Sequence, residues 1–407
     1  PALKSSIIWR SFLVCLLSRP SQSFISTKLL PSERLKYFHN IQKRLQISCT
    51  RANSESSNIK LPNTYRALWA DKAGSSFREV VVLREKEFPQ ISSDEVLIEV
   101  KYAGVNGGCE TFRARGEHWF ARNRESAVGF PLGAEGVGKV VQKGKDVAEV
   151  EVGDSVAFVG GAFSEYVVHK SESVVKVPAA NPEAVACRIS GLTAYGAVLD
   201  AGRAAPRQTI LITAAAGAAG SFAVQFAKQA GCNVIGTCSS KEKAQVLCKL
   251  GCDHIINYKT RNLDEFLRSK FPEGVDLVIE HVGGQMFRTA FSHLKPGGRL
   301  VLVGYISEYP HNPNASDETH HTLDFDLPSI FWKQQTIERD NKTIVGKLFS
   351  SHESVLSCRQ KVFEQLGADS LKVLVDSKHF EGLENIADAV DHMLSGKTVG
   401  KVVVKIS

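Results

Sequence analysis

The fold of this chain is decided by the stretch Ile210-Leu211-Ile212-Thr213-Ala214-Ala215-Ala216-Gly217-Ala218-Ala219-Gly220-Ser221. Its apolar start predicts a buried strand, and helical spacing from Ser221 to Gln229 predicts a helix beginning near Gly220. The two glycines let the backbone approach a pyrophosphate, and the helix N-terminus offers free N–H groups and a positive dipole end. The general dinucleotide pattern is Gly-x-Gly-x-x-Gly, and Ala215 stands here at its first glycine. The predicted site comprises Ala216, Gly217, Ala218, Ala219 and Gly220, although the same stretch also fits a tight turn without a ligand.

Strand-like and helical segments alternate after this turn. Short apolar runs predict strands over 234–236, 254–257, 276–279 and 299–303, and a helical pattern covers 241–250 before Gly251. Such alternation predicts a parallel sheet with right-handed crossovers.

The segments before and after this part show a different pattern of apolar residues. Apolar runs at 80–83, 96–100, 136–141 and 156–159 are separated by Gly and Asp turns, which predicts an open antiparallel barrel or sandwich. A helix over 383–394 and a strand over 402–404 are expected at the end, where the chain can return to the first domain. We therefore divide the chain into a leader (1–60), a β-rich catalytic part (61–185), a nucleotide-binding part (186–345) and a return to the catalytic part (346–407).

The leader holds most of the excess positive charge. Residues 1–60 contain ten Lys or Arg and two acidic residues, whereas the remaining residues are nearly balanced with 40 basic and 41 acidic ones. The balanced body argues against a nucleic-acid surface. A leader rich in Ser, Arg and Leu is typical of an organelle transit peptide, for a mitochondrion or a plastid. Its apolar run 12–17 also fits the core of a signal peptide and is too short to span a bilayer. A disordered tail without a targeting role is the alternative.

The residues after the second predicted strand indicate which dinucleotide is bound. Enzymes that bind NAD place an Asp or Glu there to hold the ribose 2′-hydroxyl. This chain has Gly236-Thr237-Cys238-Ser239-Ser240-Lys241-Glu242-Lys243 instead. A 2′-phosphate needs donors and positive charge, which Ser239, Ser240 and Lys243 supply, so NADPH is favoured over NADH. The alternative is that Ser240 caps the next helix and the lysines are solvated.

Several motifs together resemble a known family. They are Gly104-Val105-Asn106, Ser190-Gly191-Leu192-Thr193-Ala194-Tyr195, the glycine turn, Gly251-Cys252-Asp253, Ile256-Asn257-Tyr258, Val282-Gly283-Gly284 and Val303-Gly304-Tyr305-Ile306-Ser307-Glu308-Tyr309. Over about residues 62–407 the chain resembles the medium-chain dehydrogenase/reductases, nearest to the zinc-free quinone oxidoreductase branch and its prostaglandin reductase 3 group. The resemblance implies an α/β protein with a GroES-like β-rich catalytic domain, a Rossmann doubly wound parallel sheet, NADPH as cofactor and a homodimer.

The resemblance also implies cofactor contacts beyond the glycine turn. They fall on Asn106, Thr193, Tyr258, His281, Val303, Tyr309, Lys347, Leu348, Phe349 and Thr398. Tyr309 would also lie near the substrate, where either its hydroxyl or water supplies the proton of the reaction. His281 replaces a serine of the family and is expected either to donate a hydrogen bond or to titrate near neutral pH. Lys347 adds charge beside the substrate pocket.

The motifs do not predict a metal site. Related alcohol dehydrogenases carry Gly-His-Glu where this chain has Gly133-Ala134-Glu135, and no cysteine lies between Cys109 and Cys187 to form a structural zinc lobe. Without a Lewis acid, the remaining chemistry is hydride transfer to an electron-poor enone, enal or quinone. The alternatives are a zinc-dependent alcohol dehydrogenase and a non-catalytic protein that binds NADPH, such as the lens crystallins related to quinone reductases.

Overall fold

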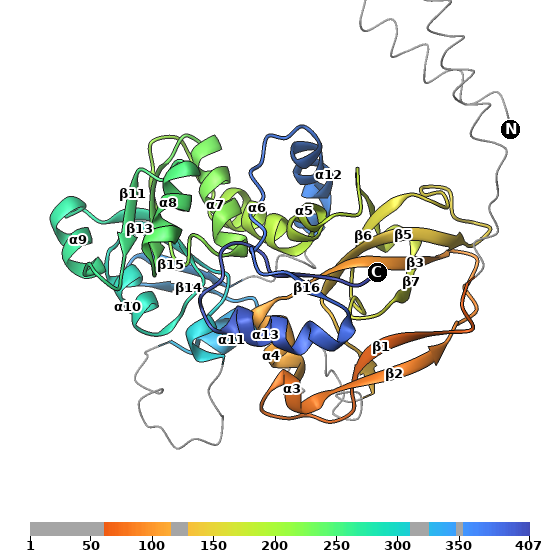
Figure 1. Cartoon of the computed structure of the whole chain (residues 1–407). Coiled ribbons are helices and arrows are strands. Elements are labelled where there is room, and N and C mark those ends of the chain that lie inside the picture. The colour runs from red at the N-terminus through yellow and green to blue at the C-terminus, as the bar shows by residue number, and fades with distance from the viewer. Residues whose placement is uncertain (1–60, 115–128, 310–324, 347–352) are drawn as a thin grey trace, which may run out of the picture. The chain divides into compact units, whose positions relative to one another are not determined.

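The computed structural model describes residues 61–114, 129–309, 325–346 and 353–407 (Figure 1). The chain divides into two units, Pro1–Lys60 and Leu61–Ser407, and all of these described ranges belong to the second unit. Within them, no helix combines the length and the apolar character needed to cross a membrane.

A seven-stranded sheet forms around the strand that was predicted directly before the glycine turn. Its strands run in the spatial order β11-β10-β9-β12-β13-β15-β14, and all neighbours are parallel except β14 and β15. The strands are β9 (Thr209–Ile212), β10 (Asn233–Cys238), β11 (His254–Asn257), β12 (Val275–Glu280), β13 (Leu294–Leu302), β14 (Thr336–Arg339) and β15 (Lys342–Gly346). The chain moves outward from β9 to β11 and then restarts on the other side at β12. The order therefore reverses between β9 and β12, which is where open α/β sheets bind ligands.

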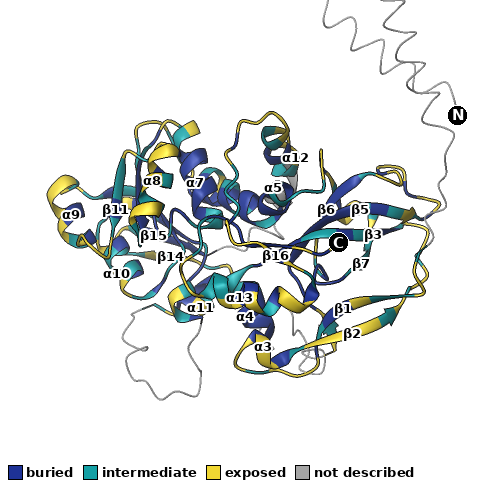
Figure 2. Cartoon of the chain, viewed as in Figure 1, coloured by how far each residue is buried: buried dark blue, intermediate teal, exposed yellow. Residues whose placement is uncertain are grey.

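Helices connect these strands and cover the sheet. They are α7 (Ala218–Gln229), α8 (Lys241–Lys249), α9 (Leu263–Lys270), α10 (Gly284–Ser292) and α11 (Leu327–Trp332). In α9 the buried side chains are Leu263, Phe266 and Leu267, a spacing that places them on one helix face. Figure 2 shows the strands largely buried and the outer surfaces of α8 and α9 exposed.

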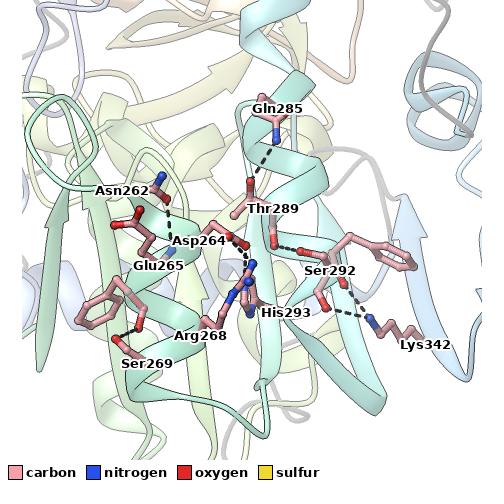
Figure 3. Close-up of polar contacts among 12 residues, drawn as sticks. Asn262, Asp264, Glu265, Arg268, Ser269, Gln285, Thr289, Ser292, His293 and Lys342 are labelled. Carbon is pink, nitrogen blue, oxygen red and sulfur yellow. Dashed lines mark hydrogen bonds and ion pairs between the residues drawn. The ribbon is translucent and has the colours of Figure 1, made fainter.

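Polar side chains connect the helices α9 and α10 to each other and to β15 (Figure 3). His293 ends α10, and its Nε2 lies 2.7 Å from the Asp264 carboxylate in the first turn of α9. Lys342 of β15 donates to the carbonyl groups of Phe291 and Ser292 at 2.9 and 3.3 Å. The Lys342 ammonium thus reaches the last carbonyl groups of α10, whose usual N–H partners four residues further on are not part of the helix.

The β-rich part contains two further sheets. The larger has the order β16-β17-β3-β5-β6-β8 with β7 paired to β3, and the smaller has the order β2-β1-β4. Their strands are β1 (Thr64–Ala70), β2 (Val81–Glu87), β3 (Glu95–Gly104), β4 (Phe130–Pro131), β5 (Glu135–Lys143), β6 (Ser155–Val159), β7 (Tyr166–Lys170), β8 (Val175–Lys176), β16 (Phe380–Glu381) and β17 (Val403–Lys405). The strand β17 pairs antiparallel with β3, which places the C-terminal segment in this sheet.

The remaining helices surround the junction of the sheets. They are α3 (Phe77–Val80), α4 (Gly107–Ala114), α5 (Pro182–Ala186), α6 (Leu192–Tyr195), α12 (Glu353–Gly367) and α13 (Ile386–Leu394). Two π-helical segments, Cys187–Gly191 and Gly196–Ala201, flank α6. The predicted fold class, a GroES-like β-rich part with a Rossmann sheet, is confirmed, whereas the predicted domain limits stay predictions.

Some element ends differ from the sequence-based prediction. The helix α7 begins at Ala218, two residues before the expected Gly220. The predicted helix 383–394 is a 3-10 turn followed by α13. Val80 ends the short helix α3 rather than beginning the strand β2. Such differences arise because helix and strand ends depend on caps and tertiary contacts more than on periodicity.

Candidate active site

One cavity of about 670 Å³ collects most of the predicted cofactor residues. It opens where the order of the parallel sheet reverses, at the carboxyl ends of β9 and β12, and its other wall comes from the β-rich part. The predicted residues that line it are Asn106, Thr193, Ala216, Gly217, Ala218, Ala219, Gly220, Ser239, Lys243, Tyr258, His281, Val303, Tyr309 and Thr398. Lys347, Leu348 and Phe349 lie outside the described residues.

The glycine turn has the geometry that a pyrophosphate needs. A Cβ on Gly220 would collide with the Ala214 carbonyl oxygen and come within 2.8 Å of the Ala215 Cα, so a side chain does not fit there. Gly217 is the N-cap of α7 and places no side chain over the helix N-terminus, whose first turn holds no acidic residue. The N–H of Gly400 donates to the Ala216 carbonyl at 2.8 Å and holds the C-terminal segment against the turn. The residues present therefore fit an anionic dinucleotide.

The residues predicted to hold the 2′-phosphate and adenine end follow β10 and β11. Ser239, Lys243 and Tyr258 line the cavity, whereas the Ser240 hydroxyl accepts the N–H of Lys243 at 3.2 Å and caps α8. The Lys243 ammonium donates to the Gly396 carbonyl at 2.7 Å. Burial lowers the pKa of Lys243 from its usual value. This cation is thus already half-buried and oriented at the edge of the cavity.

His281 lies where β12 ends and has one ring nitrogen turned away from protein partners. Its Nδ1 lies 2.9 Å from the Thr213 carbonyl oxygen, which can only accept, so Nδ1 carries the proton. Its Nε2 is buried and has no partner among the described residues. Burial lowers the pKa of His281 to about 4. The ring is therefore neutral near pH 7, which contradicts the expected titration, and its Nε2 presents a lone pair.

Aromatic side chains form the other end of the cavity. Phe112, Tyr309, Phe331 and Trp332 line it, together with Ile306 and Met393. The ring of Phe112 lies 4.9 Å from those of both Tyr309 and Trp332, in edge-to-face contact. The Tyr309 hydroxyl accepts the N–H of Tyr305 at 3.3 Å, and burial raises the pKa of Tyr309. This end favours an apolar ligand, and Tyr309 faces it as a neutral phenol.

A cluster of three polar side chains lies between these two ends. Only one of its members, Asn106, was predicted from the sequence. Lys401 forms an ion pair with Glu135, and both are almost fully buried, while Asn106 bonds to each of them. A lysine directly before an apolar strand was a signal that the C-terminal segment contributes to the site. Its partners were not predictable because they lie far away in the sequence.

Among the residues that the structure describes, no group of three or more His, Cys, Asp and Glu side chains could hold a metal ion. The Glu135 carboxylate is already occupied by Lys401, Asn106 and the N–H of Ile189. Cys109 lines the cavity, and burial raises the pKa of its thiol to about 12, which disfavours the thiolate that binds metals.

Comparison with known proteins places this geometry among oxidoreductases. The zinc-binding dehydrogenase model matches residues 218–355, and the alcohol dehydrogenase GroES-like domain model matches residues 92–179. A probable quinone oxidoreductase from Leishmania amazonensis is 36% identical and covers 85% of this chain and 99% of its own length. Prostaglandin reductase-3 from Mus musculus is 34% identical, over 85% of this chain and 90% of its own length.

A solved structure shares the same fold. The quinone oxidoreductase of Escherichia coli, determined in complex with NADPH, superposes with a TM-score of 0.68 at 24% identity. The match covers 84% of this chain and 99% of that one.

Proposed function

Because this chain belongs to the medium-chain dehydrogenase/reductases, in the group of quinone oxidoreductases and prostaglandin reductases, we propose that it transfers hydride from NADPH to electron-poor acceptors. The acceptors are conjugated C=C bonds in enones, enals and oxo-lipids, or quinones. The observation that carries this proposal is the single cavity, which joins the glycine turn and Lys243 at one end to the aromatic group at the other.

The chain's own residues bind and orient the cofactor. The N-terminus of α7 would hold the pyrophosphate, and Ser239, Lys243 and Tyr258 would hold the 2′-phosphate and adenine end. His281 and Thr193 line the same cavity and would lie toward the nicotinamide end of the cofactor. When bound, NADPH supplies the hydride, and the protein's part is to fix its position and exclude water.

The aromatic end of the cavity suits the acceptor. An enone needs a proton at its α-carbon after hydride has reached the β-carbon, and a quinone needs protons on its oxygens. Burial raises the pKa of Tyr309, so its hydroxyl is protonated near neutral pH and is a candidate proton donor, although a weaker acid than an exposed tyrosine. Phe112 and Trp332 exclude water around it, which protects the reduced cofactor from side reactions.

The decisive experiment is a panel assay with purified protein. NADPH consumption is followed with enones, enals and quinones, and product analysis locates the new hydrogen. We expect turnover with at least one class and a strong preference for NADPH over NADH. Tight NADPH binding without turnover on any acceptor would instead support the non-catalytic alternative. Loss of activity on zinc removal would support an alcohol dehydrogenase.

We also propose that this chain forms a homodimer and that it is targeted to an organelle. The strand β14 is an edge of the parallel sheet, and an edge strand can pair with a second copy. Light scattering during size-exclusion chromatography tests the mass in solution. Fusion of residues 1–60 to a fluorescent reporter tests targeting to a mitochondrion or plastid, and diffuse fluorescence would count against it.

A further inference from the structure

Three side chains from distant parts of the chain bond to one another at the wall of the cavity. Asn106 follows β3, Glu135 begins β5, and Lys401 lies two residues before β17. The Asn106 Nδ2 donates to Glu135 at 2.9 Å, and the Lys401 ammonium donates to the Asn106 Oδ1 at 2.7 Å. Lys401 also pairs directly with the Glu135 carboxylate. We call Asn106, Glu135 and Lys401 the amide triad.

The triad fixes the orientation of the Asn106 amide. A lysine ammonium can only donate and a carboxylate can only accept, so the oxygen of Asn106 faces Lys401 and its nitrogen faces Glu135. Lys401 and Glu135 are 1% and 0% exposed, and both are held by further backbone contacts. A flip of the amide would set donor against donor and acceptor against acceptor in a buried place, which is costly.

This orientation leaves one N–H of Asn106 for a ligand. The amide nitrogen carries two hydrogens, and Glu135 takes one of them. Within the described residues, the second N–H has no acceptor. Asn106 is partly exposed and lines the cavity, together with Tyr309 and Phe112 at the acceptor end. Because its oxygen accepts from an ammonium group and its first N–H donates to a carboxylate, the amide is held in one orientation.

We infer that Asn106 donates this N–H to the carbonyl oxygen of the acceptor, in place of the cofactor contact expected from the sequence, and that Lys401 and Glu135 are positioning residues for it. This inference rests on the proposed function. The β-carbon of an enone accepts hydride from NADPH, the π electrons move onto the carbonyl oxygen, and an enolate forms while the cofactor is oxidised. A proton then adds at the α-carbon. The negative charge that develops on the oxygen is stabilised by the oriented N–H, so the acceptor is reduced without a metal.

The test compares Asn106→Ala with Asn233→Ala in the full chain. Asn233 begins β10 outside the cavity and donates to Thr209, so it controls for loss of a partly buried amide contact. We expect Asn106→Ala to lower kcat on an enone about a hundredfold. Its dissociation constant for NADPH, measured by fluorescence, should stay within about twofold of the wild-type value. Asn233→Ala should change neither quantity.

A second measurement separates catalysis from misfolding. With a series of para-substituted aryl vinyl ketones, rates of the Asn106→Ala variant should depend more steeply on electron withdrawal than wild-type rates. A merely less folded enzyme would lose rate equally for all of them. If Asn106→Ala weakens NADPH binding but keeps kcat at saturating NADPH, the N–H serves the cofactor and the inference is wrong. A wild-type enzyme inactive on the whole panel would overturn the proposed function instead.

Discussion

The ring of His281 illustrates how one contact defines the chemistry of a side chain. From the sequence, it was expected to donate a hydrogen bond or to titrate near neutral pH. The Thr213 carbonyl takes its one proton at Nδ1, and burial lowers the pKa of the ring to about 4. His281 therefore carries a buried acceptor, its unpaired Nε2. The residue type decides which hydrogen bonds a side chain can form, and its neighbours decide whether each atom donates or accepts.

Lys243 provides a test of cofactor choice at the level of one residue. We expect Lys243→Met to raise the KM for NADPH by about 10- to 100-fold, because a charge-assisted bond to the 2′-phosphate contributes roughly 1.5–3 kcal/mol. The KM for NADH should stay unchanged. Lys241→Met is the matched control, since Lys241 begins the same helix but is exposed and lies outside the cavity lining. Equal changes for both dinucleotides would refute the 2′-phosphate assignment.

Tyr309 can be tested against a neighbouring tyrosine. Tyr309→Phe removes a hydroxyl at the cavity, and we expect kcat to fall by about 100-fold or more if it supplies the proton. The dissociation constant for NADPH should not change. Tyr305 is not among the cavity-lining residues, and its hydroxyl accepts at 2.8 Å from Trp332, which does line the cavity, so Tyr305→Phe should lower kcat far less than Tyr309→Phe. Similar rates in both variants would leave water as the proton source.

At the scale of single elements, the segment after α13 is held in place by one carboxylate, that of Asp376. Asp376 is 8% exposed and accepts the N–H groups of Val399 and Lys378 and the ring of His392, at 2.8, 3.0 and 3.0 Å. It thereby joins the last turn of α13 to the residues that carry Thr398 into the cavity.

This anchor gives a prediction for the stability of the element. We expect Asp376→Asn to lower the free energy of unfolding by about 2 kcal/mol, since it replaces a charged acceptor of several donors. NADPH binding should also weaken as the Thr398 segment loosens. Asp388→Asn, at an exposed position of α13, is the control. Thermal and urea unfolding measure the difference, and equal stability of the two variants would contradict the anchoring role.

The same carboxylate gives a defined pH dependence. Burial acts to raise the pKa of Asp376, but the N–H groups of Val399 and Lys378 and the His392 ring hold it below its usual value. The folded-state pKa thus lies below the unfolded value of about 3.9. The stabilisation is present above that value and is lost as the pH falls through the folded-state pKa. The stability difference between wild type and Asp376→Asn should therefore shrink on acidification below about pH 4. A constant difference would exclude this linkage.

At the scale of the whole molecule, Leu61–Ser407 forms one compact unit that contains every described residue of the cavity. We expect a variant lacking residues 1–60 to keep its melting temperature and its dissociation constant for NADPH. Differential scanning fluorimetry and fluorescence titration compare it with the full chain. A clearly lower melting temperature would show that the leader contributes to folding and is more than a targeting segment.

By itself, the sequence determined the fold class and the cofactor. The glycine turn, the alternating periodicities and the segment from Ser239 to Lys243 are local features, and local spacing decides which face of an element is buried and which turn lacks side chains. The α/β fold and the use of NADPH were therefore predictable from the sequence.

The tertiary structure decided how the site is held. Asn106 and Lys401 are 295 positions apart, and they meet because β17 pairs with β3 and β3 pairs with β5. Asp376 meets Val399, and His281 meets Thr213, through similar closures of distant segments. No local pattern encodes such contacts, because they depend on strand register and on which edges the chain brings together. The sequence indicated which cofactor the turn accepts, while the fold determined which side chains face it and which way each hydrogen bond points.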